Sequence, residues 1–402
     1  MKIYFNMKKP QLFYTALLLF ITGAIFYSTK ATGFNHDFSE VAGNFRITFI
    51  VFDIIIILKL MHLLAGSSSS NKAKNFTVGL MALMILFLVL EGVFMFIPRS
   101  YGSGEPENLS ERLWFAKYWR TNTYGYRDAE INPEEDKKKF KIMILGDSFV
   151  AGHGIKDPEQ RFSNLLQKKL PEKYRVFNLG LNGADTQAEF DKLTHFPLKP
   201  DLLILAHYVN DIERVSRKKN NALLFEKRKS YSQKAEIIAP PLVKTLIRNS
   251  YLFNYFYYKF ATGVKIFSNK KRKPATKEYM LSDGNKNNYQ SFYLRKDMFQ
   301  EHLNNLYRFV LLGRQENIPL LVLLFPEAWD ETIDYSETYI NKPIRKFFNE
   351  QGIQVLDTYS LFKELPVYER VINNTDAHPS VVVNQKIADA LYARLTSLGL
   401  VH

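Results

Sequence analysis

The chain lacks several features that identify common classes of protein. It has no cysteine, which excludes disulfide bonds and thiolate metal ligands. It contains no phosphate-binding loop, no dinucleotide-binding fingerprint and no visible internal repeat. His153, His195 and His207 show no metal-ligand spacing with acidic residues, so we expect them to be structural. We therefore expect neither a metal ion nor a cofactor.

Apolar residues are concentrated at the amino-terminal end of the 402-residue chain. Within residues 1–98, three apolar runs cover Leu12–Tyr27, Ile47–Leu64 and Phe76–Ile97. Each is close to the roughly 20 residues that a helix needs to cross a hydrocarbon core. A signal peptide would instead have one short apolar region and a cleavage site. The pattern predicts an anchor of three transmembrane helices.

The basic residues around these runs favour a cytoplasmic amino terminus, because lysine and arginine collect on the cytoplasmic side of membranes. They are Lys2, Lys8 and Lys9 before the first run, and Lys72 and Lys74 between the second and third. Three crossings then place residues 99–402 outside the cytoplasm, in the periplasm or the extracellular space.

Two acidic residues, Asp53 and Glu91, fall inside the predicted spans. Ionisable groups are costly in that environment and are usually retained for a reason. We interpret both as polar contacts that hold the helices together or face a membrane partner, rather than as parts of a transport pathway.

The net charge of +14 is confined to one segment. Residues 214–296 hold 20 lysines and arginines against four acidic residues, a net charge of +16. The segment also carries a cluster of aromatic residues, Tyr251, Phe253, Tyr255, Phe256, Tyr257, Tyr258 and Phe260. Aromatic and basic residues together suit a membrane interface or an anionic polymer, and nucleic acid is a poor candidate outside the cytoplasm. The alternative is an insertion whose aromatic rings pack on the catalytic domain and whose lysines are solvated.

After a connector at 99–140, short apolar strands alternate with amphipathic helices. The expected strands cover 141–145, 175–179, 201–206, 319–324 and 353–356, and the expected helices cover 160–170, 186–195, 298–315, 342–351 and 379–395. This alternation predicts an α/β domain over 141–402. Its parallel sheet should be covered on both faces, and the basic segment at about 214–296 should interrupt it.

Four short segments carry side chains that suit acyl transfer. Gly146-Asp147-Ser148 follows the first strand, Gly183 the second and Asn210 the third, and Asp376-Ala377-His378 lies near the carboxyl end. A serine at the tip of a buried strand can act as a nucleophile, with a histidine as its base and an aspartate to orient the histidine. A glycine N–H and an asparagine amide can donate to the developing oxyanion.

These segments resemble the SGNH, or GDSL-type, hydrolase family over roughly residues 140–213 and 370–396. The resemblance implies a three-layer, flavodoxin-like fold. It also implies that Ser148 is the nucleophile and His378 its base. The backbone N–H groups of Ser148 and Gly183 and the amide of Asn210 would form the oxyanion hole.

The chain departs from the family pattern at two positions. The family usually has a glycine two residues before its asparagine, where this chain has Tyr208. The family acid usually stands three residues before the histidine, where this chain has Thr375. Because an Asp-x-His spacing occurs among related polysaccharide O-acetyltransferases, we expect Asp376 to be the acid.

The sequence therefore predicts a membrane-anchored, extracytoplasmic serine esterase or O-acyltransferase that acts on glycan or lipid esters of the cell envelope. The expected partners are the acylated substrate, the lipid bilayer and, for a transferase, a membrane protein that supplies acyl groups. The alternative is a non-catalytic glycan-binding or assembly factor with an SGNH-like domain.

Overall fold

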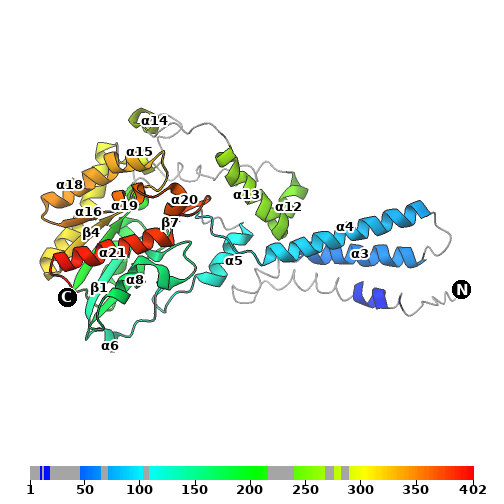
Figure 1. Cartoon of the computed structure of the whole chain (residues 1–402), viewed down its shortest axis with the longest axis horizontal. Helices are drawn as coiled ribbons and strands as arrows, with labels where there is room; N and C mark the ends of the chain where they lie inside the picture. Colours follow the sequence, from blue (N-terminus) through cyan, green and yellow to red (C-terminus); the bar gives the residue numbers. More distant parts are fainter. Residues whose placement is uncertain are drawn as a thin grey trace. The chain divides into compact units, whose positions relative to one another are not determined.

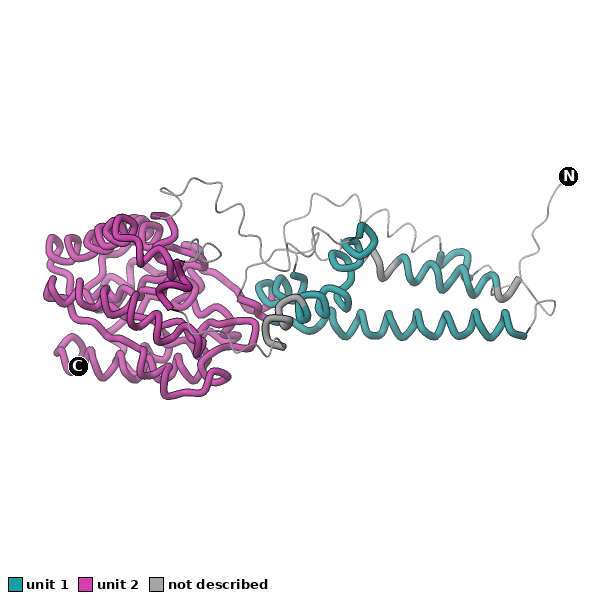
Figure 2. The backbone as a smooth tube through the Cα atoms, turned by 90° about the horizontal axis from the view of Figure 1, so that it is seen from above, with its two compact units in different colours: residues 1–99, 105–116, 230–267 teal, residues 100–104, 117–229, 268–402 magenta. Residues whose placement is uncertain are grey.

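A computed structural model describes residues 10, 13–18, 46–64, 71–102, 108–215, 240–267, 276–281 and 289–402. The chain divides into two compact units, which Figure 2 colours separately. Unit 1 comprises residues 1–99, 105–116 and 230–267, and unit 2 comprises residues 100–104, 117–229 and 268–402. The connector and the basic segment predicted from the sequence are each divided between the two units.

Unit 1 contains α3 (Arg46–Leu64) and α4 (Asn71–Met95), which pack against each other. It also contains α12 (Pro241–Asn249) and α13 (Tyr251–Phe267) from the basic segment, and most of α5 (Leu109–Tyr118). Among the described residues, α4 is the one helix that is long and apolar enough to cross a membrane. The first predicted span, Leu12–Tyr27, lies largely outside the described residues, so the three-span anchor stays a prediction.

The acidic residue of α4 has a different partner from the one expected. Glu91 hydrogen-bonds to the start of α13, and not to another predicted span. This contact joins residues that are 159 positions apart, so no local pattern in the sequence indicates it.

Unit 2 is built around a parallel sheet that includes β1 and β4 (Figure 1). The sheet has five strands, in the order β2-β1-β3-β4-β5. The strands are β1 (Phe140–Gly146), β2 (Tyr174–Gly180), β3 (Leu202–His207), β4 (Leu320–Leu324) and β5 (Gln354–Asp357). This is the flavodoxin-like order that the resemblance implied. The predicted α/β class with a parallel sheet is confirmed.

Helices cover both faces of the sheet. One face carries α8 (Phe162–Lys169) and α21 (Val381–Ser397), and the other carries α9 (Thr186–Thr194), α16 (Lys296–Glu316) and α18 (Lys342–Glu350). Successive strand residues alternate between the two cores, since side chains along a strand point to opposite faces. In β1, Ile142 and Ile144 lie in the first core, and Met143 and Leu145 in the second.

Shorter elements complete unit 2. They are α6 (Pro133–Asp136), α7 (Ser148–Ala151), η2 (Pro158–Gln160), η3 (Val209–Ile212), α14 (Lys277–Leu281), α15 (Tyr289–Phe292), α17 (Ile333–Ser336), η5 (Glu337–Asn341), α19 (Tyr359–Lys363) and α20 (Val367–Arg370).

An antiparallel hairpin carries the last of the four predicted segments. It consists of β6 (Val371–Asn373) and β7 (Asp376–Pro379), and it is separate from the main sheet. The hairpin was not predicted, because strands of three and four residues are too short to show a period in the sequence. Asp376 and His378 therefore lie on an ordered strand and not in a plain loop.

Candidate active site

Ser148 lies where the sequence analysis placed it, just beyond the carboxyl end of β1. It is the first residue of α7, and it is 7% exposed. The preceding Asp147 caps this short helix, because its Oδ1 accepts a hydrogen bond from the N–H of Phe149 at 2.8 Å. The serine is thus held in one orientation at the edge of the sheet.

The structure brings Ser148, His378 and Asp376 into one hydrogen-bonded chain. Nε2 of His378 lies 2.8 Å from Oγ of Ser148, and Nδ1 of the same ring lies 2.5 Å from Oδ1 of Asp376. Residues 148 and 378 come from opposite ends of the domain sequence, and the hairpin β6–β7 brings the histidine to the serine. This order of nucleophile, base and acid is the one that acyl transfer by serine requires.

The carboxylate of Asp376 is completely buried, and both of its oxygens accept hydrogen bonds. The hydroxyl of Ser100 donates to its Oδ2, and the backbone N–H of His378 donates to its Oδ1 at 3.1 Å. Burial alone would raise the pKa of Asp376, but the adjacent His378, with help from the Ser100 hydroxyl, outweighs it and lowers the pKa below its ordinary range. Asp376 is therefore ionised at neutral pH and can stabilise a protonated imidazole.

Two glycines make room for this carboxylate. A Cβ on Gly102 would lie 2.6 Å from Oδ1 of Asp376, and a Cβ on Gly154 would lie 2.8 Å from Oδ2. Both also have positive φ, +65° and +82°, which favours glycine over any other residue. Ser100, Gly102 and Gly154 were not among the predicted site residues, since nothing in the sequence near them indicates a contact with Asp376.

The two further donors predicted for the oxyanion hole lie at the same edge of the sheet. Gly183 is in the turn after β2, with a φ of +71° and open space where a side chain would be. Asn210 is in η3 directly after β3, and its side chain lowers the pKa of the Asp147 carboxyl against the larger raising effect of burial. Both residues thus follow strands that flank β1, while their roles as donors stay predictions.

His153 belongs to this site, although the sequence analysis treated it as structural. Its ring stacks on that of His378, with the centroids 4.4 Å apart and the planes 15° apart. Its Nδ1 lies 3.2 Å from Oδ1 of Asn182, the residue before Gly183, and its Nε2 lies 3.9 Å from Oδ2 of Asp376. Burial and the nearby His378 lower the pKa of His153 to about 4, so its ring is neutral at pH 7. His153 therefore packs against the base, His378, and the acid, Asp376, without placing a positive charge next to them.

His153, Asp376 and His378 are also residue types that bind metal ions, and their candidate ligand atoms lie within 4.8 Å of one another. Both ring nitrogens of His378 already contact protein oxygens, however, at Ser148 and Asp376. That leaves no lone pair on this ring directed at a metal, so the geometry favours a hydrogen-bonded relay.

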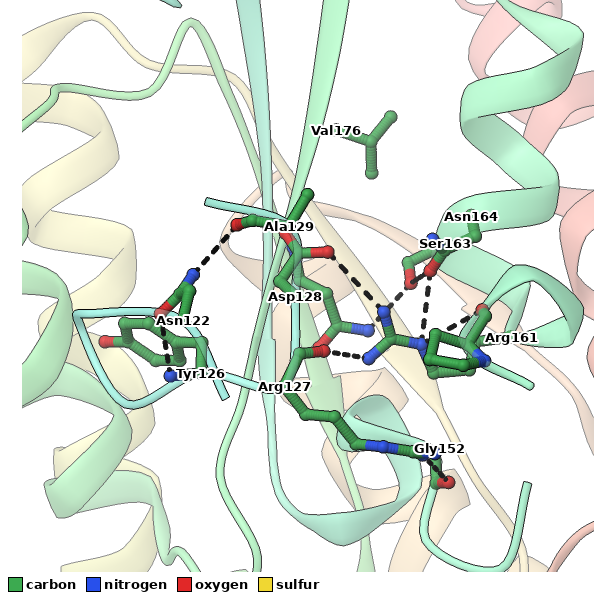
Figure 3. A network of polar contacts seen from close by, with 12 residues as sticks. Asn122, Tyr126, Arg127, Asp128, Ala129, Gly152, Arg161, Ser163, Asn164 and Val176 are labelled. Carbon is green, nitrogen blue, oxygen red and sulfur yellow. Dashed lines mark hydrogen bonds and ion pairs between the residues drawn. The ribbon is translucent and has the colours of Figure 1, made fainter. Parts of the chain in front are cut away.

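The connector before β1 holds the loop that carries His153 and Gly154 in place (Figure 3). A turn at Tyr124-Gly125-Tyr126-Arg127 positions the buried guanidinium of Arg127. Arg127 Nη1 donates to the carbonyl of Gly152 at 2.6 Å, and its Nη2 donates to the carbonyl of Ile155 at 2.6 Å. Arg161 in turn donates to the carbonyl of Arg127 and pairs with Asp128. This network fixes both ends of the loop around the site.

Tyr208, which stands where the family has a glycine, packs beside the nucleophile. Its ring stacks on that of Phe149, with the centroids 3.8 Å apart. Phe149 in turn lies against the ring of His378, at 5.2 Å between centroids. The substitution adds an aromatic wall next to Ser148 and leaves Asn210 in place after β3.

Glu327 is a buried acid just beyond the carboxyl end of β4, held by the amide of Gln290 at 2.7 Å. Burial raises its pKa to about 7, against 4.5 for a free glutamate. Between these two pH values the folded chain holds a proton that the unfolded chain has released, so stability falls as pH rises through this range.

We expect Glu327→Gln to remove this penalty. Relative to the unchanged protein, the variant should have a free energy of unfolding higher by about 3 kcal/mol at pH 8 and nearly equal at pH 4. Denaturant unfolding of the purified protein at both pH values measures the difference. Glu350→Gln, at an exposed glutamate, is the control and should change neither value. An equal gain from Glu327→Gln at both pH values would contradict the expectation.

The described residues also line a cavity of about 330 Å³ next to Pro319, Gly352 and Leu400. It lies near the amino ends of β4 and β5, whereas Ser148 lies at the carboxyl end of β1. It is therefore separate from the candidate active site.

Comparison with known proteins finds similarity in solved structures alone. No protein-family model matches the chain, and no curated protein matches it. A carbohydrate acetylesterase family member from Sinorhizobium meliloti is 14% identical, covering 64% of this chain and 99% of its own, with a TM-score of 0.35. The psychrotrophic esterase EstA from Pseudoalteromonas sp. is 13% identical, covering 65% and 100%, with a TM-score of 0.37.

A third solved structure, from Desulfitobacterium hafniense DCB-2, carries a description that assigns it to the G-D-S-L family of lipolytic proteins. It is 12% identical and covers 63% of this chain and 99% of its own, with a TM-score of 0.35. The family that the four sequence segments resemble is thus represented among the similar structures. With TM-scores below 0.5, these likenesses do not by themselves assign a function to the chain.

Proposed function

We propose that the chain is a serine ester hydrolase of the SGNH type, with Ser148 as nucleophile, His378 as base and Asp376 as acid. The hydrogen-bonded chain from Oγ of Ser148 through both ring nitrogens of His378 to Asp376 is the observation that carries the proposal. The parallel sheet that presents the first three motifs at one edge supports it.

The chemistry follows from the positions of these atoms. As Oγ of Ser148 attacks the ester carbonyl, Nε2 of His378 accepts the hydroxyl proton, and the carboxylate of Asp376 stabilises the resulting imidazolium. The C–O bond to the alcohol then breaks, and His378 returns the proton to the departing alkoxide. The acyl group stays on Ser148 until a water molecule, deprotonated by His378, releases it as a carboxylic acid.

The negative charge that develops on the carbonyl oxygen needs donors. The N–H groups of Ser148 and Gly183 and the amide of Asn210 would supply them. The side chain of Asn210 acts on the pKa of Asp147, the residue that precedes the nucleophile, so its amide lies close to Ser148.

Asn210→Ala should lower kcat for an activated acetyl ester by about 100- to 1000-fold, which is typical for the loss of one oxyanion donor. KM should change little, because the interaction is made mainly in the transition state. Steady-state kinetics measures both. Asn349→Ala, at an exposed asparagine of α18, is the matched control. A raised KM with an unchanged kcat would mean that Asn210 binds substrate and does not stabilise the oxyanion.

The proposal also covers the cellular location of unit 2 and the molecule that accepts the acyl group from Ser148. Three amino-terminal spans with a cytoplasmic start would place unit 2 outside the cytoplasm, near glycan or lipid esters of the cell envelope. The apolar length of α4 supports an anchor. A reporter fused at His402 tests the orientation, since activity in the cytoplasm would overturn it.

Transfer of the acyl group to a sugar hydroxyl is the second outcome for the same acyl-enzyme, and it would need a membrane partner that supplies acyl groups. Purified protein given a labelled activated acetyl ester, with and without a glycan acceptor, separates the two. We expect free acetate in both cases if the protein is a hydrolase, and labelled glycan in the second case if it is a transferase. Label found in free acetate alone would exclude the transferase.

A further inference from the structure

The buried end of α4 makes a contact that the proposed chemistry does not use. The carboxylate of Glu91, which is 2% exposed, accepts hydrogen bonds from Oγ of Ser250 at 2.7 Å and from the N–H groups of Tyr251 and Leu252 at 2.6 and 3.1 Å. These residues form the start of α13. Glu91 therefore caps the first turn of α13 from a different helix, where a negative charge is favourable.

Aromatic rings extend this contact along α4. Phe94 lies 4.8 Å from Tyr255 and 5.3 Å from Phe256 between ring centroids, and Phe87 lies 6.1 Å from Phe253. These aromatic residues of the basic segment pack on the predicted membrane helix, and both helices belong to unit 1. Of the two alternatives that the sequence left open, the packing on α4 fits the first, a membrane interface.

The same helices leave large apolar side chains uncovered. On α12 and α13, Leu242 is 71% exposed and Phe260 is 59% exposed. At the nearby end of α4, Val89 is 58% and Val93 51% exposed, and Phe96 just beyond the helix is 76% exposed. Single exposed apolar residues are common, but a group of them on helices in contact marks a surface that binds something apolar.

The charge of this part of the chain indicates what that surface binds. Residues 240–267 contain four basic residues and no aspartate or glutamate, the basic residues being Lys244, Arg248, Lys259 and Lys265. Long basic side chains can bury their stems in the apolar layer and keep their charged ends at the headgroups. Helices with basic and aromatic residues bind surfaces of anionic lipid in this manner.

The position of Glu91 fits the edge of a bilayer. It stands four residues before the end of α4 at Met95, a rise of about 6 Å along the helix. The start of α13 thus lies level with the last turn of α4, where a membrane helix leaves the hydrocarbon core. A buried carboxylate that accepts three hydrogen bonds is tolerated near the edge of the hydrocarbon core.

We propose that α12 and α13 lie on the membrane surface beside the end of α4, in contact with anionic lipid, and that Glu91 fixes them there. The proposal rests on α4 crossing the bilayer, which is part of the proposed function. On this proposal, α12 and α13, which belong to the basic segment, bind the protein to the membrane surface.

The absence of cysteine makes a direct test simple, because a single introduced cysteine is the one site of labelling. Spin labels are placed on the full chain at Leu242→Cys and Phe260→Cys, in nanodiscs of neutral or of anionic phospholipid. Leu83→Cys, at a residue of α4 that is 66% exposed, reports on the anchor, and Tyr368→Cys, at a residue of unit 2 that is 78% exposed, is the aqueous control. Relaxation by oxygen indicates lipid, and relaxation by a water-soluble nickel chelate indicates water.

We expect the labels at 242, 260 and 83 to respond mainly to oxygen and the label at 368 to nickel. The response to oxygen at 242 and 260 should be stronger with anionic than with neutral lipid. Labels at 242 and 260 that behave like 368, while 83 still responds to oxygen, would overturn the proposal and leave the anchor intact. If the label at residue 83 also responds mainly to nickel, as the aqueous control at residue 368 does, α4 does not cross the bilayer. The predicted anchor and the proposal then both fail. Equal responses in the two lipids would overturn the role of anionic lipid.

The role of Glu91 is tested in the same system. Glu91→Ala should shift the label at 260 towards nickel and increase its mobility, while 83 and the turnover of an acetyl ester stay unchanged. Glu91→Gln, which keeps one acceptor oxygen, should restore part of the original response. An unchanged label at 260 in Glu91→Ala would show that Glu91 does not hold α13 at the surface.

Discussion

Ser148→Ala should lower kcat for an activated acetyl ester by about 10⁵-fold or more, which is the range found when a catalytic serine is removed. Oγ of Ser148 is the atom that Nε2 of His378 contacts at 2.8 Å. Without this oxygen no acyl-enzyme can form. The residual rate should reflect the oxyanion donors and substrate binding alone.

Two measurements make this expectation decisive. A fluorophosphonate probe, which reacts with activated serines, should label the unchanged protein and leave Ser148→Ala unlabelled. Ser360→Ala, at an exposed serine of α19, should be labelled like the unchanged protein and turn over ester at its rate. Absence of labelling in the unchanged protein, or equal labelling of Ser148→Ala, would support the non-catalytic alternative and contradict the proposed function.

The sheet and the positions of its motifs could be predicted because their signals are local. An apolar run such as 141–145 shows a buried strand within a few residues, and β1 is observed at Phe140–Gly146. The parallel arrangement then places the carboxyl ends of neighbouring strands at one edge. Motifs that directly follow β1, β2 and β3 must therefore lie near one another, although they are separated in the sequence.

The surroundings of the acid could not be predicted, because they depend on contacts between distant residues. Ser100 and Asp376 are 276 residues apart, and no local pattern around either one indicates the other. A side chain at Gly102 or Gly154 would collide with the carboxylate of Asp376. The need for glycine at these two positions is therefore visible only in the folded structure. His153 was missed for the same reason, since its stacking on His378 depends on the hairpin β6–β7.

The basic segment shows a second limit of sequence reasoning. Its composition favoured a membrane or polymer interface, which stays a prediction, and it did not indicate which helices would form that interface. That division depends on Glu91 of α4 binding the start of α13, and on rings such as Phe94 packing against Tyr255. An acid inside an apolar run indicates that a partner is needed, and it does not identify the partner.

Asp376→Ala should lower kcat for the same ester by about 10⁴-fold, whereas Thr375→Ala should change it only slightly. Asp376 is the residue that contacts Nδ1 of His378, at 2.5 Å. The hydroxyl of Thr375 instead donates to Oδ1 of Asn373 at 2.7 Å, within the turn of the hairpin. The family position three residues before the histidine is therefore occupied by a residue that contacts its own turn.

The loss of activity in Asp376→Ala should come from a lower kcat of the folded protein, although the variant should also lose some thermal stability. Removing the carboxylate leaves Ser100 without that acceptor and leaves the imidazolium of His378 without a counter-charge when it forms. Asp376→Asn separates these effects, because it keeps the volume and a hydrogen-bonding group but removes the charge. It should lose nearly as much activity as the alanine variant while it retains more of the thermal stability. A larger loss in Thr375→Ala than in Asp376→Ala, measured by steady-state kinetics on folded protein, would show that the acid has been assigned to the wrong residue.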